Sequence, residues 1–372
     1  MSGAALLFAN LGAEEGGAWL RASRHPRVRS VARLWATLFP ADARLAGPGA
    51  PVPARLAPPF AGGAEEAAFP FCAPGRALVP WLATPEAEAL ARTEGVPLAG
   101  PTPDVVARVH DKAFAQAQAR ALGLVPAELR DAELLLEPDD LRDADAVRCR
   151  IEAELARWPD DLAARFVLKP RSGTSGRGRI PGQAGCVDPE RLSPAALERL
   201  RACGGALVEP WLERTLDLSA QLYVAGASEV RVLGTLRLEV TRSGGPAGNA
   251  GRLRADGSVD SGTPWDGELR AAALAVAGAA AGAGFRGACG IDAFVFRAGD
   301  GREVLRPVVE LNARFTMGTV ALGVLERAKR AGLARGGAEF YFGFSHDAGG
   351  ELLTVLDGDP SARLHLSTRS LP

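Results

Sequence analysis

Three polar side chains that can bind a hard metal ion, Asp292, Glu310 and Asn312, stand inside two apolar stretches of the sequence. Residues 290–296 and 307–315 are short, apolar and rich in β-branched and aromatic residues, which is typical of buried strands. The polar, glycine-containing segment between them predicts a turn, so the two strands should pair antiparallel. Glu310 and Asn312 are two residues apart and therefore face the same side of a strand. Two carboxylates and an amide oxygen on one face are ligands that suit Mg²⁺.

The simplest alternative for this hairpin is that its polar residues merely face water. Because an unpaired carboxylate is costly inside such apolar strands, we favour the metal site. The segment Glu310-Leu-Asn-Ala-Arg314, with Asp292 on the preceding strand, resembles the metal-binding signature of the ATP-grasp superfamily. In that family, an acidic residue and a Glu-x-Asn pair hold two Mg²⁺ ions that bridge the ATP phosphates, and Mn²⁺ can replace Mg²⁺. The resemblance therefore implies ATP as the nucleotide.

A first lysine stands where the resemblance requires one. Thr102 followed by a proline is a helix-start signal, Gly123 can end a helix, and the apolar residues between them have helical spacing. The sequence therefore predicts one helix between these positions, with Asp111 and Lys112 on it. In the ATP-grasp family the corresponding lysine reaches the nucleotide phosphates. The alternative for Lys112 is a solvated charge on a helix surface.

A second lysine, Lys169, ends a strand predicted over residues 165–169 and leads into a loop rich in glycine, serine and arginine. Glycines let the backbone approach phosphate oxygens, and exposed amides and hydroxyl groups can cradle them. The loop is not a Walker A motif, because its lysine precedes the glycines. In the ATP-grasp family such a loop is the lid over the nucleotide, which implies that Lys169, Ser172 and Gly173 bind ATP. The alternative is a flexible surface loop.

The same resemblance identifies residues for the nucleotide base and ribose. The apolar segment before Glu209 predicts a strand. In the family this position is the hinge between two lobes that clamp ATP, which implies that Glu209 and the backbone of Trp211 and Leu212 bind adenine. A later carboxylate binds the ribose hydroxyls. Glu213 and Asp217 are both candidates, and we prefer Asp217 because it opens an alternating strand. The alternative is a strand carboxylate without a ligand.

Two arginines are candidates for stabilising charge during the reaction. Arg314 stands two residues beyond Asn312, on the same face of the predicted strand, and its fixed fork of donors suits a phosphate or an oxyanion. Arg237, on a strand predicted within residues 229–241, would extend toward the phosphates or the acyl phosphate if the resemblance holds. Some amino-acid ligases of the family place an arginine two residues before the metal-binding aspartate. Here that position is Gly290, which argues against a D-alanine ligase.

Two later segments have weaker assignments. Residues 242–252 are too rich in glycine to be predicted as a packed strand. The resemblance implies a loop over the active site at this position. Arg252 and Arg254 are candidates to meet a substrate carboxylate there, although surface arginines are common. The tail is predicted to end in a hairpin of residues 339–344 and 352–356, without chemistry.

The order of elements predicts an α/β fold, the mixed α+β arrangement of ATP-grasp proteins, in three parts. Residues 1–105 alternate strands and helices, which predicts a small N-terminal α/β domain with a parallel sheet. One strand of that sheet is predicted at residues 34–39. The resemblance implies that residues 106–208 form a central lobe with the glycine-rich lid. It also implies that residues 209–372 form a C-terminal lobe with the metal site, so that the two lobes clamp ATP.

Bulk composition narrows the class of protein. A hydrophobic fraction of 47% and a charged fraction of 23% are those of a folded soluble chain. A formal net charge of −1 gives no basis for binding nucleic acid. The N-terminal segment lacks signal-peptide features and no apolar segment reaches membrane-spanning length, so we expect a cytoplasmic protein without membrane contact. Five cysteines without CxxC spacing predict buried thiols instead of disulfides.

Together, these residues and the resemblance imply an ATP-dependent ligase. In the family, a carboxylate attacks the γ-phosphate of ATP to give an acyl phosphate and ADP, and an amine then displaces phosphate. The partners would be a small-molecule carboxylate, such as an amino acid or a small peptide, and an amine; the sequence identifies neither. Two alternatives stay open: a kinase that phosphorylates a small molecule at the same site, and a non-catalytic nucleotide-binding protein. Dimerisation is common among such relatives, so a homodimer is compatible with the resemblance.

Overall fold

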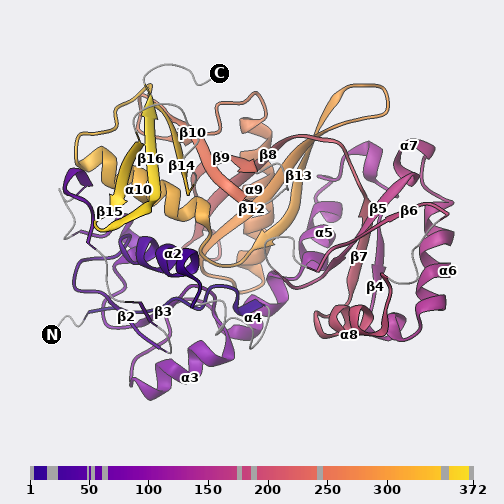
Figure 1. Cartoon of the computed structure of the whole chain (residues 1–372), viewed down its shortest axis with the longest axis horizontal. Coiled ribbons are helices and arrows are strands. Elements are labelled where there is room, and N and C mark those ends of the chain that lie inside the picture. Colours follow the sequence, from indigo (N-terminus) through magenta and orange to yellow (C-terminus); the bar gives the residue numbers. More distant parts are fainter. Residues whose placement is uncertain are drawn as a thin grey trace.

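The structure, a computed structural model, describes residues 4–14, 24–47, 50–51, 55–60, 66–173, 178–185, 191–240, 246–344 and 352–367. Three β-sheets organise these residues: a three-stranded N-terminal sheet, a four-stranded sheet and a nine-stranded sheet (Figure 1). The mixed α/β class predicted from the sequence is confirmed. No helix in these ranges is both long enough and apolar enough to span a membrane.

The N-terminal sheet is parallel, as predicted. Its central strand β1 (Leu6–Phe8) lies between β2 (Arg44–Leu45) and β3 (Leu78–Pro80). Two helices, α2 (Pro26–Ala36) and α3 (Pro85–Thr93), accompany the sheet, and each begins with proline in its first turn. Proline is favoured there because the first amides of a helix have no partner within the helix.

The strand predicted at residues 34–39 is wrong, because these residues form the end of α2 and the turn after it. Helical spacing places Val31, Leu34 and Trp35 on the buried face of α2. The Trp35 ring packs edge-on against Trp81, with ring centroids 5.7 Å apart. The error arose because a short apolar run does not distinguish a buried strand from a buried helix face.

The four-stranded sheet forms a central lobe with its own hydrophobic core. Its elements are β4 (Leu134–Leu136), α6 (Ala144–Leu155), α7 (Asp160–Ala163), β5 (Arg165–Pro170), β6 (Ile180–Gln183), α8 (Pro194–Ala202) and β7 (Ala206–Pro210). The strand order is β4-β7-β5-β6, with antiparallel neighbours. Short 3₁₀ helices at Ala127–Leu129 and Pro138–Arg142 precede the main helices of this lobe. Phe294 and Phe296 from the nine-stranded sheet join the same core, so the two sheets pack through shared apolar contacts.

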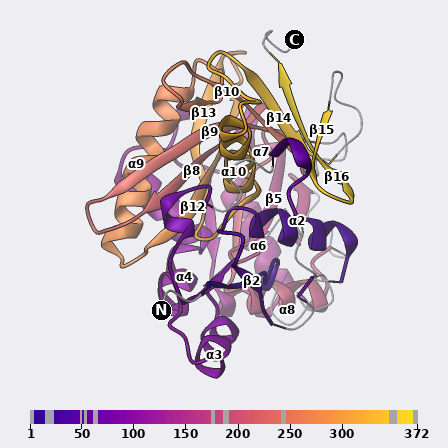
Figure 2. The same ribbon diagram turned by 90° about the vertical axis from the view of Figure 1, so that its left-hand side faces the viewer.

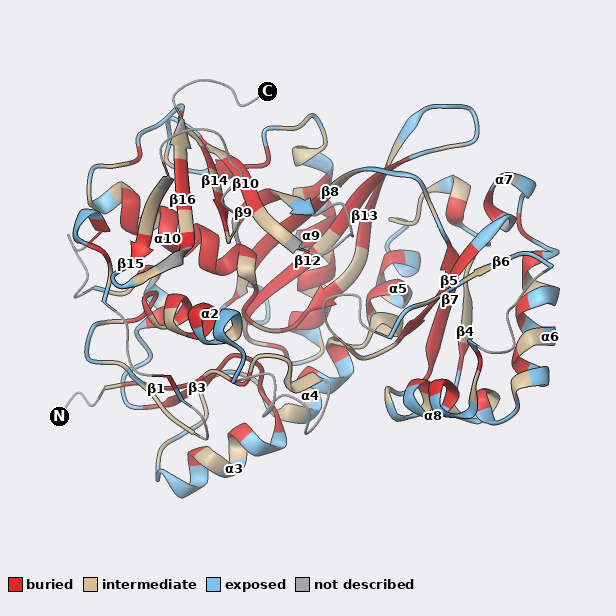
Figure 3. Cartoon of the chain, viewed as in Figure 1, coloured by how far each residue is buried: buried red, intermediate tan, exposed pale blue. Residues whose placement is uncertain are grey.

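The nine-stranded sheet forms most of the C-terminal part of the chain. Its strands are β8 (Arg214–Val224), β9 (Val230–Val240), β10 (Pro246–Leu253), β11 (Val259–Asp260), β12 (Gly287–Arg297), β13 (Glu303–Asn312), β14 (Glu339–Gly343), β15 (Leu352–Leu356) and β16 (Asp359–Ser367). The order is β13-β12-β8-β9-β10-β14-β16-β15, and β11 pairs with β10. Helices α9 (Asp266–Gly282) and α10 (Met317–Arg330) pack against the sheet (Figure 2). Strands β8 and β12 are largely buried (Figure 3).

Residues of the N-terminal sheet and of the nine-stranded sheet belong to one continuous hydrophobic core. The four-stranded sheet has a separate core, and helix α5 (Lys112–Ala121) lies between it and β13 (Figure 1). Two further 3₁₀ helices, Pro58–Phe60 and Pro70–Cys72, belong to the irregular connection of the N-terminal region. The domain boundaries proposed at residues 105 and 208 stay predictions.

The loop predicted over residues 242–252 is wrong for its described part, because β10 is a strand paired with β9 and β14. A Cβ atom on Gly248 would lie 2.6 Å from the ring of Tyr341, and one on Gly251 would lie 3.0 Å from the ring of Phe340. These glycines therefore make room for aromatic rings on β14. Glycine in a strand often marks such a close approach, which a composition-based prediction mistakes for a loop.

The predicted terminal hairpin also needs correction. β14 does not pair with β15 in the structure; β16 lies between them and pairs with both. The tight turn at residues 357–358 brings β16 back along β15, and Gly358 adopts a φ of 68° there. Glycine accepts this left-handed backbone conformation without the steric cost that other residues meet.

The cysteines are only partly as predicted. Cys72 and Cys289 are buried, and burial raises the pKa of both thiols to about 12. Cys203 is half-buried and Cys149 is exposed, so the prediction of buried thiols is wrong for these two. Cys186 lies outside the described residues.

Candidate functional site

The hairpin that carries the candidate metal ligands is formed by β12 and β13, which pair antiparallel as predicted. Asp292 lies directly opposite Glu310, and Gly290 lies opposite Asn312. Asn312 Nδ2 donates a hydrogen bond to Asp292 Oδ2 at 3.1 Å. The structure thus brings the three side chains together on one face of the sheet. Among the described residues, no group of three or more His, Cys, Asp or Glu side chains is arranged to hold a metal ion.

The two carboxylates share an environment that disfavours two negative charges. Burial raises the pKa of Asp292 to about 8, and the Glu310 charge adds to this shift. Burial also acts to raise the pKa of Glu310. The Lys112 ammonium, with Nζ 3.2 Å from Oε2, outweighs that effect and holds the pKa below its usual range. The pair is therefore asymmetric, with the charge favoured on Glu310 and disfavoured on Asp292. Two carboxylates and an amide oxygen fit Mg²⁺ in donor type.

Lys112 stands at the start of a helix instead of within one. The single helix predicted across this segment is divided into α4 (Pro103–Val109) and α5 (Lys112–Ala121). Asp111 caps the second helix, because its side chain accepts a hydrogen bond from the Ala113 amide at 2.8 Å. Such a local side-chain bond competes with continuation of the preceding helix. The break places Lys112 in the first turn of α5, next to the hairpin.

The Lys112 ammonium links the hairpin to the glycine-rich loop. Its Nζ lies 3.2 Å from Glu310 Oε2 and 3.5 Å from the Gly173 carbonyl oxygen. Ser172 and Gly173 therefore begin the loop beside the candidate metal ligands. Residues 174–177 of the predicted lid lie outside the described residues.

Arg171 holds the base of this loop, a role that was not predicted. Its Nε lies 3.0 Å from Asp111 Oδ2, and its Nη1 lies 2.7 Å from Glu137 Oε2. The Lys112 amide donates to the Arg171 carbonyl at 3.2 Å. Because Asp111 caps α5, these contacts join the loop base to the first turn of that helix.

The second lysine belongs to a buried ionic cluster. Lys169 on β5 and Arg306 on β13 both donate to the carboxylate of Glu209 on β7. The exposed fractions of these side chains are 7%, 8% and 2%, respectively. Burial lowers the pKa of Lys169 to about 8. Although burial opposes ionisation of Glu209, the Arg306 and Lys169 charges hold its pKa well below the usual range.

Arg306 was missed by the sequence analysis. It lies opposite Phe294, and the register between this pair and the Asp292–Glu310 pair is irregular, with Pro307 inside the irregular segment. Proline within a strand is typical of such a bulge, because it cannot donate a ladder hydrogen bond. The sequence nevertheless contains a signal for Arg306. It is the only charged residue between Glu303 and Glu310, and it is an even number of residues before Glu310, as expected for two side chains on one face of a strand.

Trp211 and Leu212, whose backbone was predicted to bind adenine together with Glu209, follow directly after β7. The Trp211 amide donates to the Arg165 carbonyl at 2.9 Å, so this amide already has a partner. The Arg165 guanidinium lies 5.6 Å from the centroid of the Trp211 ring. Leu212 packs partly buried against the core of the central lobe. Adenine binding by these residues stays a prediction.

The two ribose candidates differ in their surroundings. Asp217 lies opposite Phe294 of β12, and its Oδ1 accepts a hydrogen bond from Arg214 at 2.9 Å. Its side chain is 19% exposed, whereas that of Glu213 is 74% exposed and lies 3.6 Å from Arg297. The preference for Asp217 stays a prediction.

Arg314 was predicted to share a face with Asn312. The strand ends at Asn312, and the Arg314 amide donates back to the Asn312 carbonyl at 2.8 Å, so the strand alternation does not extend to Arg314. The Arg314 guanidinium donates instead to Glu14 of the N-terminal region. Glu14 lies 3.9 Å from His110 Nε2, and its Oε2 has no hydrogen-bond partner among the described residues. Glu14 and His110 were not identified from the sequence, because their pairing joins distant segments.

The other predicted arginines bond elsewhere in the nine-stranded sheet. Arg237 donates to the Ser261 carbonyl at 2.6 Å. Arg252 and Arg254 both pair with Asp260 on β11. The structure therefore brings none of these three to the hairpin ligands by a described contact, and their proposed ligand roles stay predictions.

The placement of lysines is informative because the chain uses so few. Three lysines stand among 43 lysine and arginine residues: Lys112, Lys169 and Lys329. The first two lie in the candidate site. Lys329 lies on α10, where it pairs with Glu326 at 2.6 Å.

The fold of this chain is similar to that of solved structures, among them those of a carboxylase and a synthetase. Pyruvate carboxylase from Rhizobium etli matches with a TM-score of 0.51 and 16% sequence identity over 92% of this chain and 31% of its own. D-alanyl-alanine synthetase A from Vibrio cholerae matches with a TM-score of 0.50 and 13% identity over 90% of this chain and 100% of its own. The chain has the ATP-grasp fold. No protein-family model and no curated protein matches the sequence.

The extent of these matches limits what they establish. The ATP-grasp chain spans about a third of the pyruvate carboxylase chain. Identities of 13% and 16% show the fold alone, so the chemistry depends on this chain's own residues. Those residues meet where the β12–β13 hairpin, α5 and the four-stranded sheet come together.

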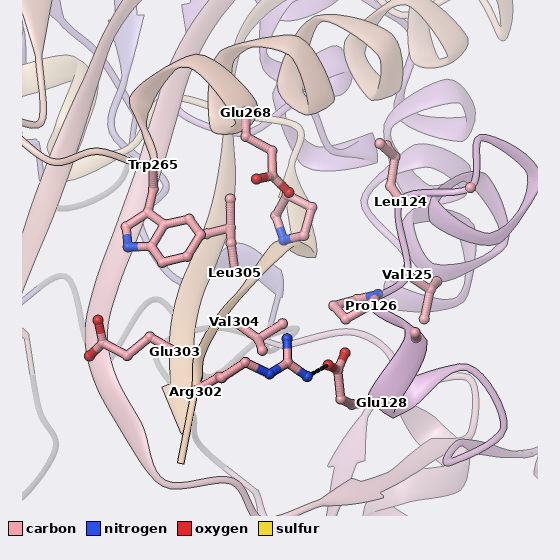
Figure 4. A pocket seen from close by; sticks show the side chains of 13 residues that line it. Leu124, Val125, Pro126, Glu128, Trp265, Glu268, Arg302, Glu303, Val304 and Leu305 are labelled. Atoms are coloured by element: carbon pink, nitrogen blue, oxygen red, sulfur yellow. Dashed lines mark hydrogen bonds and ion pairs between the residues drawn. The ribbon is translucent and has the colours of Figure 1, made fainter. Parts of the chain in front are cut away.

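A pocket of about 350 Å³ lies at the start of β13 (Figure 4). Trp265 and Leu305 line one part of it, and the Arg302–Glu128 ion pair lies at another. Its lining residues are Gly123, Leu124, Val125, Pro126, Ala127, Glu128, Trp265, Glu268, Arg302, Glu303, Val304, Leu305 and Pro307. None of the candidate ligands described above belongs to it, so the pocket is separate from the site.

Proposed function

We propose that this protein is an ATP-dependent carboxylate–amine ligase that forms a C–N bond. In the proposed reaction, a carboxylate oxygen of a small acid (an amino acid or a small peptide) attacks the γ-phosphorus of ATP, and ADP leaves. The amine nitrogen then attacks the acyl carbon, and inorganic phosphate leaves. The observation that carries the proposal is the Lys112 ammonium, which contacts both Glu310 and the Gly173 carbonyl of the glycine-rich loop.

Asp292, Glu310 and Asn312 would hold Mg²⁺. The resemblance implies two such ions, which Mn²⁺ can replace. Bound Mg²⁺ supplies positive charge that offsets negative charge on the phosphates. The raised pKa of Asp292 supports this assignment, because a buried carboxylate pair that retains a proton gains from exchanging it for a cation. The side chains of these three residues would fix the position of that charge on the β12–β13 hairpin.

The remaining predicted residues would bind and orient ATP. Lys112 and Lys169, with Ser172 and Gly173, would bind phosphate oxygens through charge and backbone groups. Glu209 and the backbone near Trp211 and Leu212 would bind adenine, and Asp217 would bind the ribose hydroxyls, as the resemblance implies. Fixed positive groups stabilise a transferring phosphoryl group more than its ground state when they are held in place beforehand.

Arg314 and Arg237 would stabilise negative charge on the reacting groups. Arg314 pairs with Glu14 in this structure, so an acid substrate or acyl phosphate would take the place of a carboxylate at that guanidinium. Arg237 would have to exchange its bond to the Ser261 carbonyl for a ligand oxygen. We further propose small-molecule partners only, a cytoplasmic location and a homodimer as the assembly to test by light scattering.

The test is phosphate release with Mg-ATP and pooled amino acids and small carboxylic acids, with mass spectrometry on the same samples. ADP, phosphate and a product mass equal to acid plus amine minus water are expected. ADP together with a substrate whose mass has increased by one phosphoryl group would show that the protein is a kinase and not a ligase. ATP binding without turnover under any acid and amine would favour a nucleotide-binding protein. Glu310→Gln serves as the matched inactive control.

A further inference from the structure

The buried cluster around Glu209 holds two cations on one carboxylate. Lys169 donates to Oε2 and Arg306 donates to Oε1 of Glu209. Gln116 adds a weaker contact, with Nε2 3.5 Å from Oε1. Because all three charged side chains are at most 8% exposed, solvent does little to balance their charges. Each oxygen of Glu209 therefore has its own cationic partner.

The two cations come from different sheets. Lys169 and Glu209 lie on the neighbouring strands β5 and β7 of the four-stranded sheet. Arg306 lies on β13 of the nine-stranded sheet, four residues before Glu310. Its guanidinium carbon is 5.7 Å from the centroid of the Phe294 ring, and that of Arg214 is 4.2 Å from the same centroid. Arg306 thus reaches Glu209 across the contact between the sheets.

Under the proposed function, the Lys169 ammonium would have two partners, Glu209 and a nucleotide phosphate, which it cannot bind at the same time. In this structure its ammonium is committed to Glu209, whereas nucleotide binding requires that ammonium for a phosphate oxygen. If Lys169 were the only partner of Glu209, its departure would leave a buried carboxylate without a counter-charge. Such a carboxylate is costly and takes up a proton instead.

We propose that Arg306 is a positioning residue that keeps Glu209 ionised and in place when Lys169 leaves it for a nucleotide phosphate. This inference rests on the proposed function, since it assumes that Lys169 binds ATP. Arginine suits the role because its guanidinium stays charged even when buried and holds a carboxylate with a fixed fork of donors. Lys169 suits the mobile role, because burial already lowers the pKa of its ammonium to about 8 in the cluster.

The test measures nucleotide binding and the protons that accompany it. The full chain is titrated with β,γ-imido-ATP and Mg²⁺ by calorimetry at pH 7 in two buffers of different ionisation enthalpy. The variants are Arg306→Met, Arg306→Lys and the double variant Glu209→Gln/Arg306→Met. Arg302→Met is the matched control, because Arg302 precedes the same strand but is 65% exposed and pairs with Asp300 and Glu128.

For Arg306→Met we expect affinity at least about 10-fold weaker, with uptake of about one more proton per nucleotide than in the wild type. Its affinity should fall by about 10-fold for each unit of rising pH near neutrality, because the complex then binds one more proton than the free protein. Arg306→Lys and Arg302→Met should keep the wild-type proton count. The extra uptake should disappear in the double variant, which lacks the titrating carboxyl group.

A wild-type proton count in folded Arg306→Met overturns the proposal, whatever the loss of affinity, because a purely structural arginine would weaken binding without changing proton uptake. If circular dichroism shows that Arg306→Met is unfolded, Arg306→Gln replaces it under the same criteria, since glutamine keeps a hydrogen-bond donor without the charge. Absence of nucleotide binding in the wild type would instead overturn the proposed function and this inference with it. The two failures are therefore distinct.

Discussion

Asp292 lies directly opposite Glu310 in the antiparallel β12–β13 pair, so two carboxylates meet on one face of a buried hairpin. A different neighbouring side chain stabilises each carboxylate. Asn312 donates a hydrogen bond to Asp292, and Lys112 provides the ammonium next to Glu310. This arrangement separates the pKa values of the pair, with that of Asp292 raised and that of Glu310 lowered. These contacts support the proposal that Asp292, Glu310 and Asn312 hold a divalent cation.

Glu310→Gln should abolish Mg²⁺-dependent turnover while leaving the fold intact. Glutamine keeps the size and hydrogen-bonding ability of the side chain but loses the charge that a divalent cation requires. We expect a decrease in kcat of about 100-fold or more, as is typical when one group that stabilises transition-state charge is removed. Phosphate release across a Mg²⁺ titration measures the effect, and Asn312→Ala should behave similarly.

Glu303→Gln is the matched control for the metal site, because Glu303 is exposed at the other end of the same strand. It should keep wild-type turnover and Mg²⁺ dependence. Near-normal turnover in folded Glu310→Gln or Asn312→Ala would contradict the metal-site assignment. Circular dichroism and thermal unfolding of each variant separate loss of the site from loss of the fold.

The hairpin could be predicted because its determinants are local. Period-two apolar patterning, a glycine-containing turn and two polar residues at even spacing define the strands and the shared face of Glu310 and Asn312. The β10 strand could not be predicted in the same way. Its glycines are needed by the Tyr341 and Phe340 rings of a strand almost a hundred residues later, and nothing near Gly248 reports those rings.

Other site residues were not predicted for the same reason, because their partners are distant in the sequence. Arg306 and Glu14 gain their roles through partners in other sheets or segments, Glu209 and Arg314, respectively. The break before Lys112 was missed for a more local reason. Asp111 is compatible with either a helix interior or a cap, and its bond to the next helix's first turn decides between them.

The three lysines allow a direct test of the nucleotide site. A lysine-specific acylating reagent should modify Lys112, Lys169 and Lys329 in the free protein, to extents that follow their exposure. ATP with Mg²⁺ should protect Lys112 and Lys169, because a phosphate-bound ammonium stays protonated and shielded. Lys329 should react equally with and without nucleotide, since it lies on α10 and pairs with Glu326. Peptide mass spectrometry quantifies each site.

The comparison within one sample provides its own control, because Lys329 corrects for reagent decay and for protein concentration. Because Lys169 is only 7% exposed in the free protein, the test uses the modification that it does undergo. A measurable extent that is equal with and without saturating ATP would contradict its role at the phosphates. As a second measurement, Lys169→Ala should weaken ATP binding by about 10-fold or more. Its fold should survive, because Glu209 keeps Arg306 as a partner.

His110 should make the protein sensitive to acid. Burial and the Arg314 and Lys112 charges lower the pKa of His110 to about 4, from an ordinary value of 6.5, while Glu14 and Glu310 act in the opposite direction. Between these two values, the unfolded chain binds a proton at His110 that the folded chain does not. The histidine's contribution to stability is therefore complete above pH 6.5 and is lost as pH falls toward 4, by about 3 kcal/mol in total.

His110→Asn isolates this contribution. The asparagine carbonyl can accept the hydrogen bond that the Ala313 amide donates to His110 Nδ1 at 3.0 Å, but it does not titrate. The difference in unfolding free energy between wild type and variant, measured in urea from pH 7 to pH 4, should fall by about 1.4 kcal/mol per unit within that interval. A difference independent of pH would show that His110 does not titrate with a depressed pKa.

Two glycine-to-alanine substitutions test why β10 contains glycine. A Cβ atom on Gly248 would lie 2.6 Å from the Tyr341 ring, whereas one on Gly278 in α9 would meet nothing within 4 Å. Gly248→Ala should therefore lower the free energy of unfolding by about 1–3 kcal/mol, because the ring or the strand must shift. Gly278→Ala should raise it by about 0.5–1 kcal/mol, because alanine favours a helix interior.

Urea denaturation gives both values under identical conditions. Gly248→Ala/Tyr341→Ala adds a second test, since removing the ring should remove the steric cost of the new methyl group. In that background, the destabilisation caused by Gly248→Ala should fall below about 0.5 kcal/mol. An unchanged cost would show that the Tyr341 ring is not the reason for glycine at position 248.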